Sequence, residues 1–341
     1  MNQDSLNVEI DRLVKEFGSV HDLDYVNDLV RTSLQLGTDQ TTTLDLKIAS
    51  SALREMRDAF QMFQPHAHRR KVTIFGSART KPHDPLYNHT ENIARELAQR
   101  GWMVVTGAGP GIMEAGMSGA GRSQSIGVSI RLPFESSANP IIAGDDKFVS
   151  MRYFFTRKLM LVKESHAFIC MPGGFGTLDE TFELLTLVQT GKSAPTPIVM
   201  LDLPGDDFWH SIDDVVQKQM LKRSLVSPED LDLYRVCETI EDAVSEITLF
   251  YRNYHSIRFV GKHLVVRLQL PPTELLLEEL NAEFGYLCKA GSFERISATP
   301  SEISDNDHLD KFRIRFEFVR DDFGGLRRLI NKLNQAATEP Q

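Results

Sequence analysis

Between residues 71 and 250, short apolar runs alternate with longer amphipathic runs, and several of the apolar runs end in glycine. The apolar runs have the length of strands, and most of the segments between them have helical spacing. Strands that are apolar throughout are typical of a parallel sheet covered by helices on both faces. Ligands bind at the carboxyl ends of such strands, so we expect a site where the glycine-rich ends meet. The runs are KVTIFGS, WMVVTG, SIGVSI, HAFICMPGG and PIVMLD.

The segments on either side of this region have different patterns. Residues 1–66 have helical spacing and no convincing strand, whereas residues 255–341 mix two strands, HLVVRLQL and FRIRFEF, with two helices. We therefore predict an N-terminal helical extension (1–66), a Rossmann-like, doubly wound α/β domain (67–254) and a small α+β domain of ferredoxin-like type (255–341).

Bulk properties exclude several classes of protein. The 341 residues carry a formal net charge of −9, which argues against general binding to nucleic acid or anionic membranes, since both need a basic surface. Three widely spaced cysteines form neither a disulfide framework nor a zinc pattern. No apolar run reaches the roughly 18 residues of a membrane span, and the N-terminus is acidic and polar. We expect a cytoplasmic protein without a metal site.

Three glycine-rich loops follow strands of the central region: residues 75–79 (FGSAR), 106–111 (TGAGPG) and 172–177 (PGGFGT). Glycines at strand ends let backbone N–H groups approach an anion, and a following helix N-terminus adds free donors. We predict that the loops hold one phosphate and its sugar, although each loop alone also fits a tight strand-to-helix turn. The candidate binding residues are Gly76, Ser77, Gly107, Gly109, Gly111, Met113, Glu114, Gly173, Gly174, Phe175, Gly176 and Thr177.

Two charged positions leave alternatives open. Glu180 lies three residues after Thr177, so it fits the capping box S/T-x-x-E, which the local sequence favours, or it faces a ligand. In the helix expected over 151–165, Lys158 interrupts an apolar stripe beside Arg157. It either reaches solvent or meets an anion in a pocket, and the pocket explains the interruption better. The stripe consists of Met151, Phe154, Phe155, Leu159 and Val162.

Two segments, RKLMLVKESHAFICMPGGFGTLDE and TGAGPGIMEAGMSGA, together resemble the LOG family of cytokinin riboside 5′-monophosphate phosphoribohydrolases, often labelled lysine decarboxylase-like. The resemblance covers about residues 70–250 and includes the Arg-Lys helix and the PGGxGTxxE motif. It implies a Rossmann-like homodimer or larger homo-oligomer that hydrolyses the N-glycosidic bond of a nucleoside 5′-monophosphate without a cofactor. Arg157 and Glu180 match the catalytic pair, and Gly173, Gly174, Gly176 and Thr177 match the phosphate loop, with Lys158 in the same pocket.

The three loops are called loops one, two and three in chain order. The end of loop two and the residues after it read GPGIME (109–114), whereas the short plant-type members have a glycine-richer form. This resembles the longer bacterial branch, which acts on ordinary nucleotides such as AMP. Two alternatives stay open: a carrier of a phosphorylated pterin such as molybdenum cofactor, and a nicotinamide-dependent oxidoreductase. The G-x-G-x-G spacing of loop two weighs against the oxidoreductase. The end of the chain weakly resembles a ligand-binding ACT domain, and a plain dimerisation unit is the simpler interpretation.

Overall fold

The computed structural model describes residues 3–16, 18, 22–132 and 138–336. The chain divides into two compact units, Met1–Asp58 and Ala59–Gln341. The first unit holds α1 (Gln3–Glu16), α2 (Leu23–Thr38) and most of α3 (Thr43–Phe63), so the predicted helical N-terminus is confirmed for its described part. The predicted domain limits at residues 66 and 254 stay predictions. Within the described ranges, no helix has the length and hydropathy needed to cross a bilayer.

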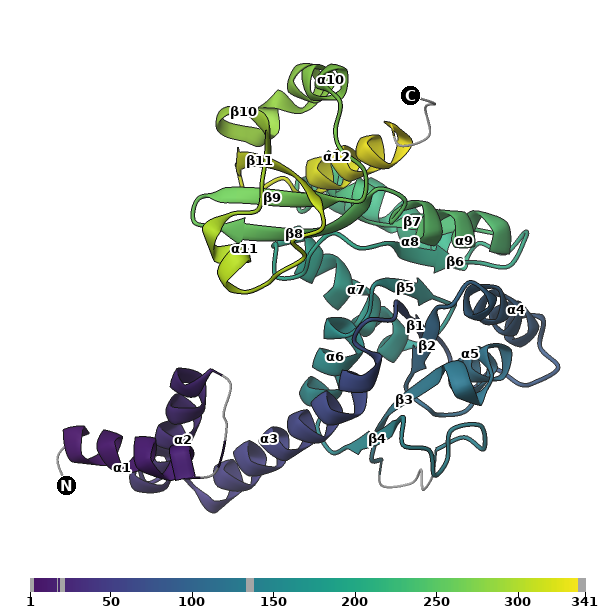
Figure 1. The fold of residues 1–341 in the computed structure, drawn as a ribbon. Helices are drawn as coiled ribbons and strands as arrows, with labels where there is room; N and C mark the ends of the chain where they lie inside the picture. Colours follow the sequence, from purple (N-terminus) through teal and green to yellow (C-terminus); the bar gives the residue numbers. More distant parts are fainter. Residues whose placement is uncertain (1–2, 17, 19–21, 133–137, 337–341) are drawn as a thin grey trace. The chain divides into compact units, whose positions relative to one another are not determined.

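The second unit is built on a seven-stranded parallel sheet with the order β4-β3-β2-β1-β5-β6-β7 (Figure 1). The chain runs outward from β1 to β4 and then returns to form β5 beside β1, so the strand order reverses between β1 and β5. This confirms the predicted doubly wound α/β fold. The strands are β1 (Lys71–Phe75), β2 (Met103–Thr106), β3 (Ser125–Ile130), β4 (Phe148–Met151), β5 (Ala167–Cys170), β6 (Ile198–Leu201) and β7 (Arg235–Cys237).

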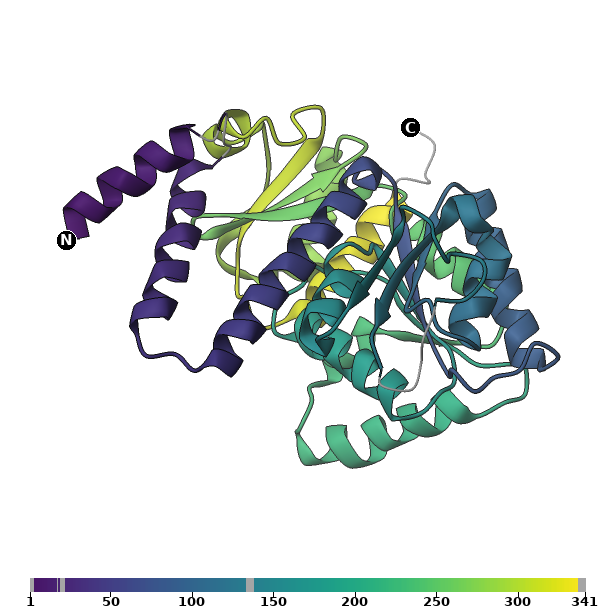
Figure 2. The same cartoon turned by 90° about the horizontal axis from the view of Figure 1, so that it is seen from below.

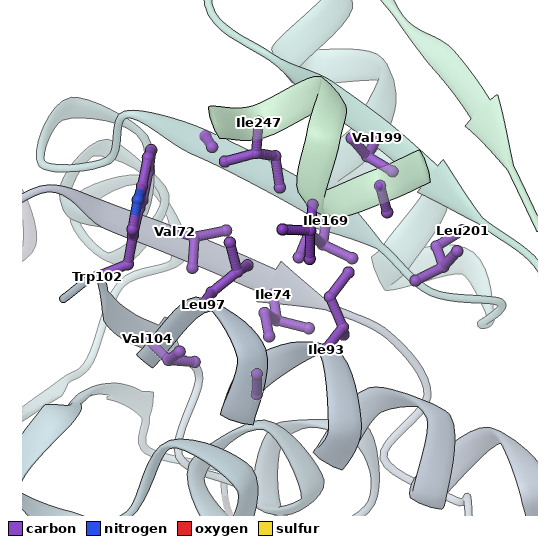
Figure 3. Close-up of a cluster of buried hydrophobic side chains, with 14 of the residues drawn as sticks. Val72, Ile74, Ile93, Leu97, Trp102, Val104, Ile169, Val199, Leu201 and Ile247 are labelled. Carbon is purple, nitrogen blue, oxygen red and sulfur yellow. The ribbon is translucent and has the colours of Figure 1, made fainter. Parts of the chain in front are cut away.

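Helices lie on both sides of these strands, with α4 and α5 opposite α6 and α7 (Figures 1 and 2). The central strands β1, β5 and β6 are buried along their whole length because both of their faces are covered, and their residues are apolar apart from Lys71 and Thr73 of β1. Val72 and Ile74 of β1 pack with Leu97 of α4 and Ile247 of α9 in one fully buried cluster (Figure 3). The helices are α4 (Pro85–Gln99), α5 (Ile112–Ala120), α6 (Phe154–Lys163), α7 (Phe175–Gln189), α8 (Phe208–Val215) and α9 (Ile240–Leu249).

Two strands of this sheet differ from the sequence-based expectation. The helix expected over 151–165 begins only at Phe154, because Phe148–Met151 pair with β3 as the edge strand β4. The short strand β7 at the opposite edge was not expected either. Runs of three or four residues are too short for periodicity to separate a strand from a loop or a helix.

The C-terminal part of the second unit holds an antiparallel sheet of order β10-β11-β9-β8. The two expected strands and two helices are present, and β8 and β10 are additional. The order is that of a ferredoxin-like sheet whose last strand stands first in the chain. Apart from the short helix α11 between β10 and β11, the succession is therefore ββαββα instead of βαββαβ. The elements are β8 (Tyr254–Val260), β9 (His263–Leu268), α10 (Glu274–Phe284), β10 (Cys288–Ile296), α11 (Pro300–Ser304), β11 (Phe312–Phe318) and α12 (Phe323–Ala336).

Candidate active site

The three glycine-rich loops follow three adjacent strands of the parallel sheet. Loop one leaves β1, loop two leaves β2 and loop three leaves β5. Phe75 and Cys170, the last residues of β1 and β5, are paired in register, so loops one and three begin side by side at the reversal of strand order. That is the position at which open α/β sheets bind their ligands.

Loops one and two pack closely against each other at Gly76 and Gly111. Gly111 has a φ of +69°, and a Cβ there would lie 2.4 Å from the carbonyl oxygen of Ser77. The next residue, Ile112, donates its backbone N–H to that same carbonyl at 3.0 Å. A Cβ on Gly76 would in turn meet the Ile112 side chain at 2.5 Å. Only glycine satisfies both positions, so these residues fix the relative placement of the two loops.

Arg157 lies on the buried face of α6. Its Nε donates to the carbonyl oxygen of Val128 at 3.1 Å, which orients the guanidinium plane. A Cβ on Gly107 would lie only 2.1 Å from Nη2 of Arg157, so loop two passes directly over the guanidinium. The absence of a side chain at Gly107 therefore makes room for the arginine as well as for a ligand.

Glu180 faces Arg157 from the second turn of α7. Its Oε1 accepts a hydrogen bond from Nη1 of Arg157 at 3.4 Å, and the two side chains are only 14% and 10% exposed. The capping-box interpretation favoured by the local sequence is wrong, because α7 begins at Phe175 with Gly174 as the N-cap. Thr177 thus lies inside the first turn and Glu180 one turn later, so the carboxylate is directed away from the cap.

The surroundings of Glu180 set its protonation. Burial raises the pKa of this carboxyl to about 7, although the charges of Arg157 and Lys158 act in the opposite direction. A carboxyl group with such a pKa exchanges a proton near neutral pH, which is the property expected of a general base.

The loops and the Arg157–Glu180 pair surround one cleft of about 890 Å³. The predicted residues that line it are Gly76, Ser77, Gly107, Gly109, Met113, Arg157, Gly173, Gly174, Phe175, Gly176, Thr177 and Glu180. Gly111, Glu114 and Lys158 do not line it. Gly111 instead packs against loop one. Glu114 lies on α5 near Tyr87, whose pKa is raised first by the burial of the tyrosine and second by the charge of Glu114. The functional roles of all these residues stay predictions.

Lys158 lies on the same face of α6 as four residues of the predicted stripe, and all of them line a second cavity: Phe154, Phe155, Leu159 and Val162. This face does not pack against the sheet, because Phe154, Phe155 and Leu159 are 54%, 55% and 44% exposed. The face of α6 that packs against the sheet carries Thr156, Arg157, Met160 and Leu161. Lys158 lines this second cavity and forms ion pairs with Asp179 and Glu183 of α7. The anion near Lys158 is therefore supplied by the protein itself.

The opposite wall of the cleft was not found from the sequence. It includes Ser129 of β3, Arg131 directly after β3, and Phe148 and Ser150 of β4. Arg79 of loop one also lines the cleft and adds a positive charge beside the glycines. Arg131 donates from Nη2 to the carbonyl oxygen of Ser150 at 2.9 Å. The end of β3 carries no glycine, so a search guided by glycine-rich strand ends passes over it. Its only sequence signal is its place at the end of a strand in the same sheet.

The replacement Gly173→Ala tests the predicted phosphate-binding role of loop three, and it is expected to weaken the binding of ribose 5-phosphate. The new Cβ would lie 2.2 Å from Oγ1 of Thr177 and 3.0 Å from the backbone nitrogen of Ser77, so loop three must move. Overpacking of this kind costs about 1–3 kcal/mol, which corresponds to a roughly five- to 150-fold rise in Kd. Isothermal titration calorimetry measures it. Gly285→Ala is the matched control, since nothing lies within 4 Å of its new Cβ. An unchanged Kd in Gly173→Ala would contradict the prediction that loop three binds the phosphate.

The fold and the cleft define a Rossmann-like α/β protein whose glycine-rich loops meet a buried arginine–glutamate pair. Residues 110–247 match the family described as "Possible lysine decarboxylase". Curated relatives of this chain are cytokinin riboside 5′-monophosphate phosphoribohydrolases, including a bacterial one. Residues 110–247 of this chain are therefore similar to the domain that defines this family.

The similarity to individual proteins is low. The phosphoribohydrolase LOG of Oryza sativa subsp. japonica is 32% identical over 37% of this chain and 53% of its own length. The Mycobacterium tuberculosis phosphoribohydrolase is 28% identical over 51% of this chain and 90% of its own length. The chain spans about half the length of the first curated relatives it matches, 45%, 53% and 57%. A solved molybdenum cofactor carrier protein of Chlamydomonas reinhardtii is 16% identical, with a TM-score of 0.37, over 52% of this chain and 95% of that chain.

Proposed function

We propose that this protein is a nucleoside 5′-monophosphate phosphoribohydrolase, which hydrolyses the N-glycosidic bond to release a free base and ribose 5-phosphate. The observation that carries the proposal is the hydrogen bond between Arg157 and Glu180 inside the cleft lined by all three glycine-rich loops. The curated relatives named as phosphoribohydrolases support the same reaction class.

The phosphate binds at loops one and three in this proposal. Gly173 and Gly174 precede α7, whose first backbone N–H groups have no partner within the helix and whose dipole favours an anion. Arg79 lies beside these loops and supplies positive charge that an anion requires. Fixing the phosphate at this end places the attached ribose toward Glu180, which lines the same cleft.

Glu180 then acts on the sugar. Cleavage of a glycosidic bond passes through an oxocarbenium-like state with positive charge on the ribose, and a nearby carboxylate stabilises that charge. As the bond between the ribose carbon and the base nitrogen breaks, the oxygen of the attacking water bonds to that carbon, and the same carboxylate accepts the proton of the water. Glu180 then returns this proton to the departing base nitrogen, and a pKa of about 7 is well matched to both transfers. Arg157 orients the carboxylate and the substrate, since a guanidinium stays charged and is a poor general acid at neutral pH.

The proposal is tested by incubating the pure protein with AMP, GMP, CMP and an isopentenyl-type adenosine monophosphate. We expect ribose 5-phosphate from at least one of them, measured by a coupled assay. A folded protein that releases none from any nucleotide refutes the proposal. A co-purified pterin with its characteristic absorbance, together with no turnover, would instead favour a carrier.

A further inference from the structure

Neighbouring residues of α6 and α7 face two different cavities. Arg157 of α6 and Glu180 of α7 line the glycine-loop cleft. Lys158, which follows Arg157, and Asp179, which precedes Glu180, instead line the second cavity of about 900 Å³. The same two helices therefore form a wall of both cavities.

Lys158 joins the two helices on the side of the second cavity. Its Nζ lies 2.8 Å from Oδ2 of Asp179 and 2.8 Å from Oε2 of Glu183. These carboxylates are one helical turn apart on α7 and flank Glu180 in sequence, so one ammonium group holds both. The Lys158 side chain is only 18% exposed, whereas Asp179 and Glu183 are 62% and 35% exposed, so the lysine end of these ion pairs is shielded and the carboxylate ends are partly open to solvent.

We propose that Lys158 is a positioning residue for Glu180: it fixes α7 against α6 and neutralises the two carboxylates that flank the reacting one. This role rests on the proposed function, and it replaces the substrate contact that the sequence favoured for this lysine. Lys158 does not touch the glycine-loop cleft, so it acts through Glu180 alone.

The charges around Glu180 determine in which direction the loss of Lys158 changes the pKa of Glu180. Arg157 and Lys158 of α6 lower the pKa of Glu180, while Asp179 and Glu183 of α7 raise it, in addition to burial. The Cys170 thiol of β5 adds no charge, because burial raises its pKa to about 12. Burial opposes the charge of Lys158, but its hydrogen bonds to Asp179 and Glu183 raise the pKa of the ammonium, so it stays protonated. Removing it leaves two uncompensated carboxylates beside Glu180, and the pKa of Glu180 must rise further above 7.

The test compares Lys158→Met and Lys158→Arg with the wild type by measuring kcat and KM for the best nucleotide across the pH range. In Lys158→Met we expect the acid limb of kcat to move to higher pH by roughly 0.5–1 unit, with KM little changed. Lys158→Arg keeps the positive charge and should therefore keep the wild-type midpoint. In the double variant Lys158→Met/Glu183→Gln, the midpoint should lie at lower pH than in Lys158→Met. An unshifted midpoint, or an equal loss at every pH, would overturn the proposal.

A second measurement separates this inference from the proposed function. The carboxyl carbon of Glu180, assigned by comparison with Glu180→Gln in ¹³C-glutamate-labelled protein, reports its pKa directly by NMR without turnover. A higher pKa in Lys158→Met supports the positioning role even if no nucleotide is hydrolysed, and an unchanged pKa refutes it. Circular dichroism on the same samples establishes that each variant is folded.

Discussion

Replacing Glu180 by glutamine is expected to slow the release of ribose 5-phosphate by about 10²–10⁴-fold. The amide keeps the size of the side chain and its ability to accept from Arg157, but it cannot take a proton from water or carry a negative charge. The phosphate end of the cleft lies at the loops, so the affinity for ribose 5-phosphate should change by less than threefold, a difference of about 0.7 kcal/mol at most. Single-turnover rates and calorimetric titration measure the two quantities.

Glu278→Gln is the matched control for this substitution, because Glu278 is an exposed glutamate on α10, far along the chain from the loops. It should keep the wild-type rate. If Glu180→Gln retained more than a tenth of the activity, Glu180 would not be the base, and the cleft would need another carboxylate.

The same residue determines the expected pH dependence. Glu180 acts in its ionised form, and burial raises its pKa to about 7, so the wild-type rate should increase as pH rises through about 7. An ordinary exposed glutamate would already be ionised at pH 5 to 6. The residual rate of Glu180→Gln should lack this rise, which distinguishes titration of Glu180 from titration of the substrate phosphate.

Replacing Glu302 by glutamine is expected to lower the free energy of unfolding by about 3–5 kcal/mol. Glu302 is fully buried on α11 between Arg267 of β9 and Arg313 of β11, whose Nε atoms donate to its Oε1 at 2.8 and 3.1 Å. Its Oε2 accepts from the backbone N–H of Thr299 at 3.0 Å. An amide would remove the counter-charge that the two buried guanidinium groups share, and this is the costly way to break a buried ion pair. Arg267 keeps its ion pair with Asp307, so the loss falls mainly on Arg313.

Urea unfolding at pH 7 measures this loss, with Glu294→Gln as the control. Glu294 pairs with Arg315 on the surface at 2.6 Å, and exposed pairs contribute at most about 1 kcal/mol. Burial by itself would raise the pKa of Glu302, but its hydrogen bonds with Thr299, Arg267 and Arg313 outweigh burial and lower it to about 2. The stabilisation is therefore complete above the unfolded pKa near 4.5 and is lost as pH falls toward 2. A Glu302→Gln protein within 1 kcal/mol of the wild type would contradict this account.

Local sequence patterns determined much of this protein. Apolar runs bounded by glycine predicted the strands β1, β2 and β5, because a strand buried on both faces needs no polar side chain. Glycines that follow those strands predicted the phosphate-type loops, and Arg157 and Glu180 were predicted as a pair. Each of these inferences depends on residues close together in the chain, or on a motif that combines them.

Tertiary structure alone decided which side chains face the cleft. The sheet-facing side of α6 is set by its packing beneath β3, which buries Arg157 and leaves Phe155 exposed, the reverse of what apolar spacing predicted. The role of Lys158 as a partner of Asp179 and Glu183 depends on the approach of α7 to α6. No pattern within one helix contains that information, since it depends on the return of the chain from β4 to β5 and the resulting strand order.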